Sequence, residues 1–340
     1  MYESDADAAR SLSWPHGRFE LQRLSAMLAP IEFHAPGMPA FSPMQIAPWA
    51  DEPGSEALPG GLRRLRGDWP CVPFGRTDRP DGLPAGWSSE APDDDFGHGF
   101  GAHHEWQWLA PPDALSLSLA IDYPSTSPVR RLVRTVTALA DEPALQSTLE
   151  VEVRRPCTLP IALHPTIRLN GGRVHLQLPH AGRAHSYPIP AEPGISRLVP
   201  DQSFEHLHAA PLSDGSVVDL SRYPLPFDTE ELLQLQSVTG PVTARFLDQG
   251  WALQLDWDRA ALPDMMLWVS HRGRRYAPWN GRHWALGLEP VNGPFDLGRV
   301  ARPPSHHPLA SRTGVMLTPG TPWRLRSEFR ALPLAAEPSR

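Results

Sequence analysis

Two polar residues interrupt apolar stretches of the sequence and could do acid–base chemistry. His164 lies within the apolar segment 159–169, and Glu289 follows Leu286 and Leu288 in the sequence HWALGLEPVNGPF. An uncompensated buried carboxylate is costly, so we expect Glu289 to be partnered or to line a cleft. A glutamate whose pKa is raised by partial burial can take a proton from a hydroxyl group near neutral pH. For His164 the alternative is a core histidine bonded to a backbone carbonyl.

Other histidines occur in pairs that could begin a metal site. His206 and His208 are separated by one residue, which would put both rings on the same face of a strand. No carboxylate at ligand spacing completes that set, so surface histidines beside a loop are the favoured interpretation. His306 and His307 lie among prolines, which predicts a solvated loop. We therefore expect no metal and no cofactor.

Arginine and tryptophan side chains supply candidate binding groups. Arg66 lies in the sequence LRGDWPCVPFG and could anchor hydroxyl or anionic groups of a substrate, the alternative being a solvated arginine. Trp69, Trp106 and Trp108 could stack on the apolar face of a sugar ring or belong to the core.

The elements that carry these residues are predicted to be strands. Proline makes up 41 of the 340 residues, more than twice the usual share of about 5 %. Each proline ring removes a backbone N–H and clashes with the preceding helical turn, so this density favours short strands joined by turns. Apolar and polar residues alternate in the segments 115–122, 149–154, 174–178, 251–258 and 323–330. This period of two is typical of antiparallel sheets with one covered face.

The predicted fold class is therefore all-β, a large antiparallel β-sandwich with few short helices. The sequence Asn-Gly-Gly at 170–172 precedes an alternating segment and predicts a hairpin. Helical periodicity is poor almost everywhere, and the best short candidate for a helix is 229–235. No composition shift marks a domain boundary.

The expected organisation is a single domain with loose ends. The domain is predicted over 13–332, with flexible tails at 1–12 and 333–340. Residues 76–97 are rich in Pro, Gly, Ser and Asp and predict a long surface loop. Long ordered loops of this kind are often functional.

Charge and missing residue types exclude several function classes. The formal net charge is −7 and no basic stripe is present, so nucleic-acid binding is not expected. The sequence contains no lysine, which excludes Schiff-base chemistry and a phosphate-loop lysine. Cys71 and Cys157 are too few for a disulfide framework or a structural zinc site. The N-terminus lacks signal-peptide features and no apolar run approaches ~20 residues, so we expect a cytoplasmic protein without membrane contact.

Four segments, in this order, resemble motifs of the aldose 1-epimerase (galactose mutarotase-like) superfamily. The resemblance is nearest to its hexose-6-phosphate 1-epimerase-like branch. RGDWPCVPFG at 66–75 is similar to that branch's RGG-x-P-x-C-x-P-x-FG segment, and HGFGAHHEW at 98–106 is similar to its HGFAR…W segment. ALHPTIRL at 162–169 occupies the place of the LHxYF segment, and LGLEP at 286–290 resembles the strand that carries the catalytic glutamate.

The resemblance implies a twisted β-supersandwich with a sugar cleft and a set of site residues. Glu289 would take the proton of the anomeric hydroxyl group, and His164 would protonate the ring oxygen. The ring would open, the C1–C2 bond would rotate, and closure on the other face would invert the anomer. His98 would hold the ring or anomeric oxygen, and Arg66 would bind substrate hydroxyl groups. The implied partner is a monosaccharide or a derivative, acted on without a cofactor by a monomer or homodimer.

Two further roles remain as candidates. The family's substrate-binding aspartate would correspond to Asp219 or Asp228, and Trp106 would contact the sugar.

The sequence also departs from the family pattern. Ala102 stands where the phosphosugar branch has arginine, and Asp68 replaces the second glycine after the motif's arginine. Pro165 and Thr166 replace an aromatic pair. These departures favour either an unusual substrate or a non-catalytic carbohydrate-binding or regulatory protein on the same fold. A metal-assisted enzyme using the histidine clusters is a third, less favoured alternative.

Overall fold

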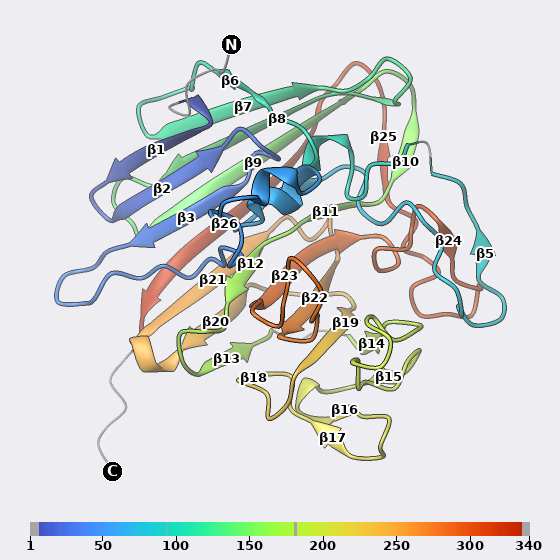
Figure 1. Cartoon of the computed structure of the whole chain (residues 1–340). Coiled ribbons are helices and arrows are strands. Elements are labelled where there is room, and N and C mark those ends of the chain that lie inside the picture. Colours follow the sequence, from blue (N-terminus) through green and yellow to red (C-terminus); the bar gives the residue numbers. More distant parts are fainter. Residues whose placement is uncertain (1–6, 93, 180–181, 335–340) are drawn as a thin grey trace.

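The computed structural model describes residues 7–92, 94–179 and 182–334. Almost all regular structure in these residues is β, and Figure 1 shows it arranged around two large antiparallel sheets. Helical structure in the same residues consists of short 3₁₀ turns. No helix in the described part of the chain is long and apolar enough to cross a membrane.

The larger sheet has nine strands and contains the alternating segments. Its order from edge to edge is β18 (Arg222–Tyr223), β13 (Val174–Gln177), β20 (Val242–Phe246), β21 (Trp251–Trp257), β26 (Trp323–Pro333), β9 (Ala144–Val153), β8 (Val129–Ala138), β7 (Ser116–Asp122) and β6 (Gln107–Leu109). All pairings in it are antiparallel.

The second sheet has eight strands and includes the strand that carries Glu289. Its order is β15 (Ser203–Phe204), β14 (Ala184–Ser186), β19 (Thr229–Leu235), β22 (Asp264–His271), β23 (Trp284–Asn292), β11 (Ile161–Leu163) and β4 (Pro70–Cys71), with β12 (Thr166–Arg168) also paired to β23. Strand β23 is thus flanked by β22 on one side and by β11 and β12 on the other.

Smaller elements complete the fold. The three-stranded sheet consists of β1 (Ala9–Trp14), β2 (Gly17–Gln22) and β3 (Leu28–Phe33); the two-stranded pairs are β10 (Cys157–Leu159) with β25 (Val315–Leu317), β16 (Ala210–Pro211) with β17 (Val217–Val218), and β5 (Ser88–Ser89) with β24 (Ala301–Arg302). The 3₁₀ turns are η2 (Ser55–Ala57), η3 (Gly60–Arg64), η4 (Phe100–Ala102), η5 (Leu207–Ala209) and η6 (Leu247–Gln249).

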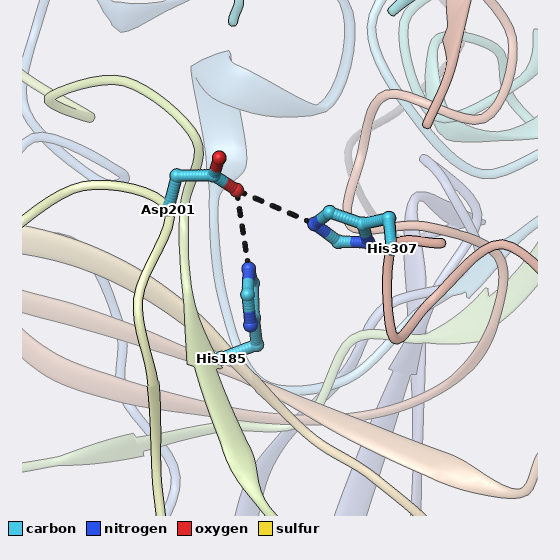
Figure 2. A group of neighbouring side chains, drawn as sticks. All are labelled: His185, Asp201 and His307. Atoms are coloured by element: carbon cyan, nitrogen blue, oxygen red, sulfur yellow. Dashed lines mark hydrogen bonds and ion pairs between the residues drawn. The ribbon is translucent and has the colours of Figure 1, made fainter. Parts of the chain in front are cut away.

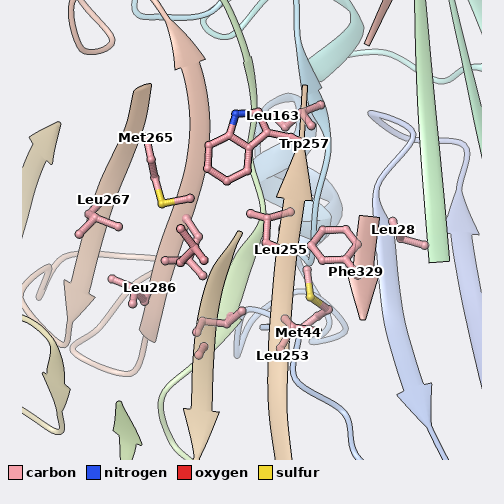
Figure 3. Packing of buried hydrophobic residues seen from close by; sticks show 14 of the residues in the cluster. Leu28, Met44, Leu163, Leu253, Leu255, Trp257, Met265, Leu267, Leu286 and Phe329 are labelled. Atoms are coloured by element: carbon pink, nitrogen blue, oxygen red, sulfur yellow. The ribbon is translucent and has the colours of Figure 1, made fainter. Parts of the chain in front are cut away.

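The core lies between the two large sheets. Figure 3 shows Leu253 and Leu255 of β21 in the same packed cluster as Met265 and Leu267 of β22 and Leu286 of β23. Because successive strand residues point to opposite faces, one face of each strand contributes to this cluster. The predicted antiparallel β-sandwich is confirmed, and the alternation in the sequence marks the face of the larger sheet that is buried.

The eight-stranded sheet is covered on both faces. Every residue of β22 is buried, although only alternate residues can face the larger sheet. On the outer face, Trp268 packs against Trp49 and Trp279 from connecting segments. The outer face therefore has its own cover of loops, and the candidate site lies beneath it.

This double cover explains why one prediction is wrong. Residues 229–235, the best helical candidate, form strand β19, which pairs along its whole length with β22 and at its end with β14. Only one of its seven residues is not buried. A strand that is covered on both faces shows no polar–apolar alternation, so periodicity could not identify it.

Two further predictions need correction. The turn at 170–172 does not close a hairpin, because β12 before it pairs with β23 and β13 after it pairs with β18 and β20. The predicted tail 1–12 is wrong for its last residues, since strand β1 begins at Ala9 and pairs with β2. Residues 1–6 and 335–340 of the predicted tails lie outside the described residues.

A buried ion pair joins the larger sheet to the segment that precedes β4. Arg134 of β8 and Asp68 are both almost fully buried and bonded to each other. Arg134 also donates hydrogen bonds to the backbone oxygens of Ala26, at 2.7 Å, and Asp68, at 2.9 Å. The negative charge of Asp68 is therefore compensated inside the protein.

We expect Arg134→Ala to lower the free energy of unfolding by about 3–5 kcal/mol, because it leaves the Asp68 carboxylate buried without its cation. Urea denaturation measures the change. The control is Arg131→Ala on the same strand, which removes an exposed ion pair with Asp122 and should cost at most ~1 kcal/mol. Equal losses in the two variants would contradict the assigned role of the buried pair.

Candidate functional site

A cavity of about 340 Å³ opens on the outer face of the eight-stranded sheet. The side chains of His98, His164, Glu289 and Asp296 all line it. Its walls are largely apolar and aromatic, and a volume of this size is in the range of small-molecule sites. The three predicted catalytic residues are thus brought together by segments that lie far apart in the sequence.

Strand pairing places His164 directly across from Glu289. Ala162 of β11 is opposite Val291 of β23, and Thr166 of β12 is opposite Gly287. Counting inward from either pair puts His164, in the short break between β11 and β12, opposite Glu289. Cross-strand neighbours point to the same face of a sheet. The result is a distance of 3.4 Å between His164 Nε2 and Glu289 Oε1.

The Glu289 carboxyl group is fully buried and has no hydrogen-bond partner among the residues that the structure describes. Neither oxygen has one in the described part of the protein. Burial raises the pKa of Glu289 well above its usual value, and the nearby Asp296 adds to the effect. Space for the carboxyl group comes from Gly287, where a Cβ atom would lie 2.4 Å from Glu289 Oε1. A buried polar group without a partner, facing a cavity, is what a substrate-binding or proton-accepting group requires.

His164 is held in place by an aromatic ring and by its own backbone. The imidazole stacks on Trp69, with ring centroids 4.0 Å apart and an interplanar angle of 15°. The backbone N–H of His164 donates to the carbonyl oxygen of Trp69, and Nδ1 lies 3.3 Å from Thr166 Oγ1. Burial, reinforced by His98, lowers the pKa of His164 well below its usual value.

His98 enters the cavity from the loop before η4. Its backbone is in the left-handed region, with φ at 60°, and its N–H donates to the carbonyl oxygen of Gly75 at 2.7 Å. The ring is perpendicular to that of His164 at a centroid distance of 5.5 Å. Burial lowers the pKa of His98 to about 4, and Nδ1 has no hydrogen-bond partner in the described residues. A neutral ring with an unused nitrogen can bond to an oxygen atom of a ligand.

Asp296 is the aspartate of the cavity, and the sequence reasoning missed it. Its Oδ1 accepts a hydrogen bond of 2.7 Å from the Tyr187 hydroxyl group, and burial raises its pKa. Of the predicted candidates, Asp219 accepts from Ser221 outside this cavity, and Asp228 is paired with Arg272. The sequence does contain a signal, since Asp296 follows Glu289 closely and lies between Phe295 and Leu297.

Two other predicted binding residues do not line the cavity. Arg66 is buried and donates to Asp51 Oδ1 at 2.7 Å and to the carbonyl oxygen of Arg64 at 3.0 Å. Trp106 is fully buried, and its indole N–H donates to the carbonyl oxygen of Gly101. The aromatic walls come instead from Trp69, Trp268 and Trp279. Ala102 lines the cavity as well.

A second group of titratable residues lies outside this cavity. Figure 2 shows Asp201 between His185 and His307, with Oδ1 at 3.2 Å and 3.4 Å from their Nε2 atoms. His307 is therefore buried, contrary to the predicted solvated loop. Its Nδ1 accepts a hydrogen bond from the backbone N–H of Leu309, which puts the ring hydrogen on Nε2, toward Asp201. Asp201 is hydrogen-bonded to His185, whereas the His307 Nε2 atom is only within ion-pair distance and has no hydrogen-bond partner among the described residues. With its hydrogen on Nε2, His307 has no lone pair there for a metal ion.

A larger hollow of about 590 Å³ lies beside His206 and His208. The two rings are exposed and stacked at 5.0 Å around η5 rather than along a strand. None of the described residues that line this hollow has a buried polar side-chain atom without a partner. The surface-loop interpretation of this pair agrees with its placement, and the Glu289 cavity remains the candidate site.

Comparisons with known proteins identify the fold. No family model matches the chain, and no curated protein matches it. A "Putative aldose 1-epimerase" from Escherichia coli K12 superimposes with a TM-score of 0.66 at 17 % identity, covering 96 % of this chain and 99 % of that one. An aldose epimerase homologue from C. elegans has a TM-score of 0.60 at 13 % identity, covering 96 % and 99 %. A galactose mutarotase-like protein from Lactobacillus casei has a TM-score of 0.59 at 12 % identity, covering 95 % and 100 %.

These likenesses extend over nearly the whole chain. They confirm the predicted galactose mutarotase-like fold, while the nearest branch of the superfamily stays a prediction. The chain has the β-supersandwich fold of the aldose 1-epimerase and galactose mutarotase-like structures.

Proposed function

We propose that this protein is an aldose 1-epimerase-like enzyme that interconverts the α and β anomers of a sugar. The observation that carries the proposal is the buried Glu289 carboxyl group, without a partner in the described residues and 3.4 Å from His164 at the wall of a cavity. Solved structures with this fold include proteins described as aldose epimerases and mutarotases, which supports a sugar as the substrate.

In the proposed reaction Glu289 and His164 hold one proton between them, which is on His164 before ring opening. After ring opening, the pair again holds one proton, now on Glu289. The carboxylate of Glu289 takes the proton of the anomeric hydroxyl group, whose O–H electron pair forms the carbonyl bond as the C1–O5 bond breaks. His164 gives its Nε2 proton to the ring oxygen O5. The pair changes from carboxylate and imidazolium to carboxylic acid and imidazole, so no charge is left on the open-chain sugar.

Ring closure reverses these transfers. Rotation about C1–C2 presents the other face of the carbonyl group to O5, and each residue recovers its starting protonation state. Burial raises the pKa of Glu289 and lowers that of His164, so both shifts favour the neutral pair that follows ring opening. His98 and Asp296 are proposed to hold sugar oxygens while the ring is open. A positioned acid and base each contribute about 10²–10⁴-fold to a reaction rate.

Replacing Glu289 by Gln should lower the rate of anomer exchange by about 10²–10⁴-fold, because the amide cannot accept the proton. Saturation-exchange NMR across a panel of free, phosphorylated and acidic sugars measures the rate. Glu150→Gln, which removes an exposed partner of Arg324, is the control and should leave exchange unchanged.

The same experiment distinguishes an enzyme from a binding protein. Exchange no faster than in buffer for every sugar, together with binding of some of them, would favour a carbohydrate-binding protein. Unchanged exchange in Glu289→Gln would overturn the assignment of the base.

Glu289→Gln should also change how stability depends on pH. The raised pKa of Glu289 means that the folded protein binds this proton more tightly than the unfolded chain does. This contribution to the wild type is fully present below the unfolded pKa and is lost as pH rises through the folded pKa. We expect the variant to match the wild type at about pH 5 and to exceed it by about 1–3 kcal/mol at about pH 8–9.

Urea denaturation of both proteins at each pH tests this expectation. Taking the difference between variant and wild type removes the contributions of other titrating groups. A difference that does not vary with pH would show that Glu289 titrates normally.

A further inference from the structure

The cation of the candidate site comes from the loop between β22 and β23. Among the described residues that line the cavity, Arg274 is the one arginine, and the chain contains no lysine. Its guanidinium carbon lies 4.6 Å from the ring centre of Trp279 and 5.6 Å from that of Trp268. Arg274 is therefore in cation–π range of Trp279 and Trp268 at the wall of the cavity, within reach of a bound ligand.

Two carboxylates already balance the charge of Arg274. Its Nε atom lies 3.4 Å from Glu230 Oε1 and 3.5 Å from Glu192 Oε2. Glu230 is fully buried and also accepts hydrogen bonds from the indole N–H of Trp268 at 2.6 Å and from Ser270 Oγ at 3.1 Å. Glu192 accepts a further bond of 3.3 Å from the Tyr276 hydroxyl group. Burial raises the pKa of Glu230, and the charge of Arg274 offsets part of that shift. The positive charge of Arg274 is therefore shared with two carboxyl groups and is not free for a substrate anion.

The other ionisable side chains near the cavity do not supply an unpaired positive charge either. Glu289 and Asp296 are the two carboxyl groups of the wall. Arg76 donates a hydrogen bond to Asp78, and Arg299 donates one to Asp94. The positive charge of each guanidinium group is therefore already paired with a carboxylate. A phosphate or carboxylate on the substrate would therefore find no arginine among these side chains that is free of a carboxylate partner.

We propose that Arg274 with its two carboxylates is a specificity device that selects uncharged sugars over phosphorylated or acidic ones. The inference rests on the proposed function and deepens it. The guanidinium N–H groups donate to a sugar hydroxyl group, while Glu192 and Glu230 prevent a substrate anion from pairing with them. Like charges brought together at an interface are strongly disfavoured, which makes such a device effective.

The test compares glucose and galactose with glucose 6-phosphate and galacturonate in saturation-exchange NMR. In the wild type, kcat/KM for the neutral sugars should exceed that for the charged ones by at least ~100-fold. Glu192→Gln releases part of the charge of Arg274 and should raise kcat/KM for glucose 6-phosphate by about 10-fold while leaving that for glucose nearly unchanged.

Two further variants separate binding from folding. Arg274→Gln should raise KM for glucose more than it lowers kcat, because its contact is made with the bound sugar before and during reaction. Glu52→Gln removes the carboxylate that pairs with Arg282 in the same loop and, as a matched control, should not change the preference between glucose and glucose 6-phosphate.

The possible failures are distinguishable. Exchange of glucose 6-phosphate as fast as glucose by the wild type would overturn the inference and leave the proposed function intact. If no sugar in the panel is exchanged, the proposed function fails, and tryptophan fluorescence decides the inference through binding. Glucose 6-phosphate binding as tightly as glucose would then overturn it, and a preference for glucose that is lost in Glu192→Gln would support it.

Discussion

The structure depends on keeping the carboxyl group of Glu289 buried without a hydrogen-bond partner in the described protein. Such a group costs stability, so its surroundings must hold it firmly. The central strand β23 does this, because β22 pairs along its length and β11 and β12 pair on the other side. Gly287 leaves the space that the side chain occupies. Burial of apolar side chains between the two sheets offsets the free-energy cost of burying this carboxyl group.

Burial disfavours the charged forms of four titratable residues that line the cavity. Burial lowers the pKa of His98 and His164 and raises that of Glu289 and Asp296, so all four are shifted toward their neutral forms. Arg274 also lines the cavity and is paired there with Glu192 and Glu230. The proposed ring opening starts from a carboxylate and an imidazolium, so these shifts favour the neutral pair that follows it.

The sequence predicts the sandwich well and the site in part. Alternation identifies β21 and β26 because only one face of each is buried, whereas β19 is covered on both faces and loses the signal. Glu289 and His164 stand out in the sequence as polar residues in apolar surroundings. Their direct opposition was not predictable, since it is set by the pairing of β11 and β12 with β23. Asp296 and Arg274 lie in connections between strands, and the path of these connections depends on the whole fold. Local sequence patterns therefore do not predict that the two side chains reach the cavity.

The residues of the proposed acid–base pair and Arg274 belong to different kinds of structure. Glu289 and His164 are fixed by strand pairing in the middle of a sheet, whereas Arg274 is carried by the connection between β22 and β23. Mutations in a surface connection are tolerated far better than mutations in a central strand. Changes in the 272–283 segment would therefore alter the proposed substrate preference, while the residues proposed for proton transfer stay fixed by the sheet.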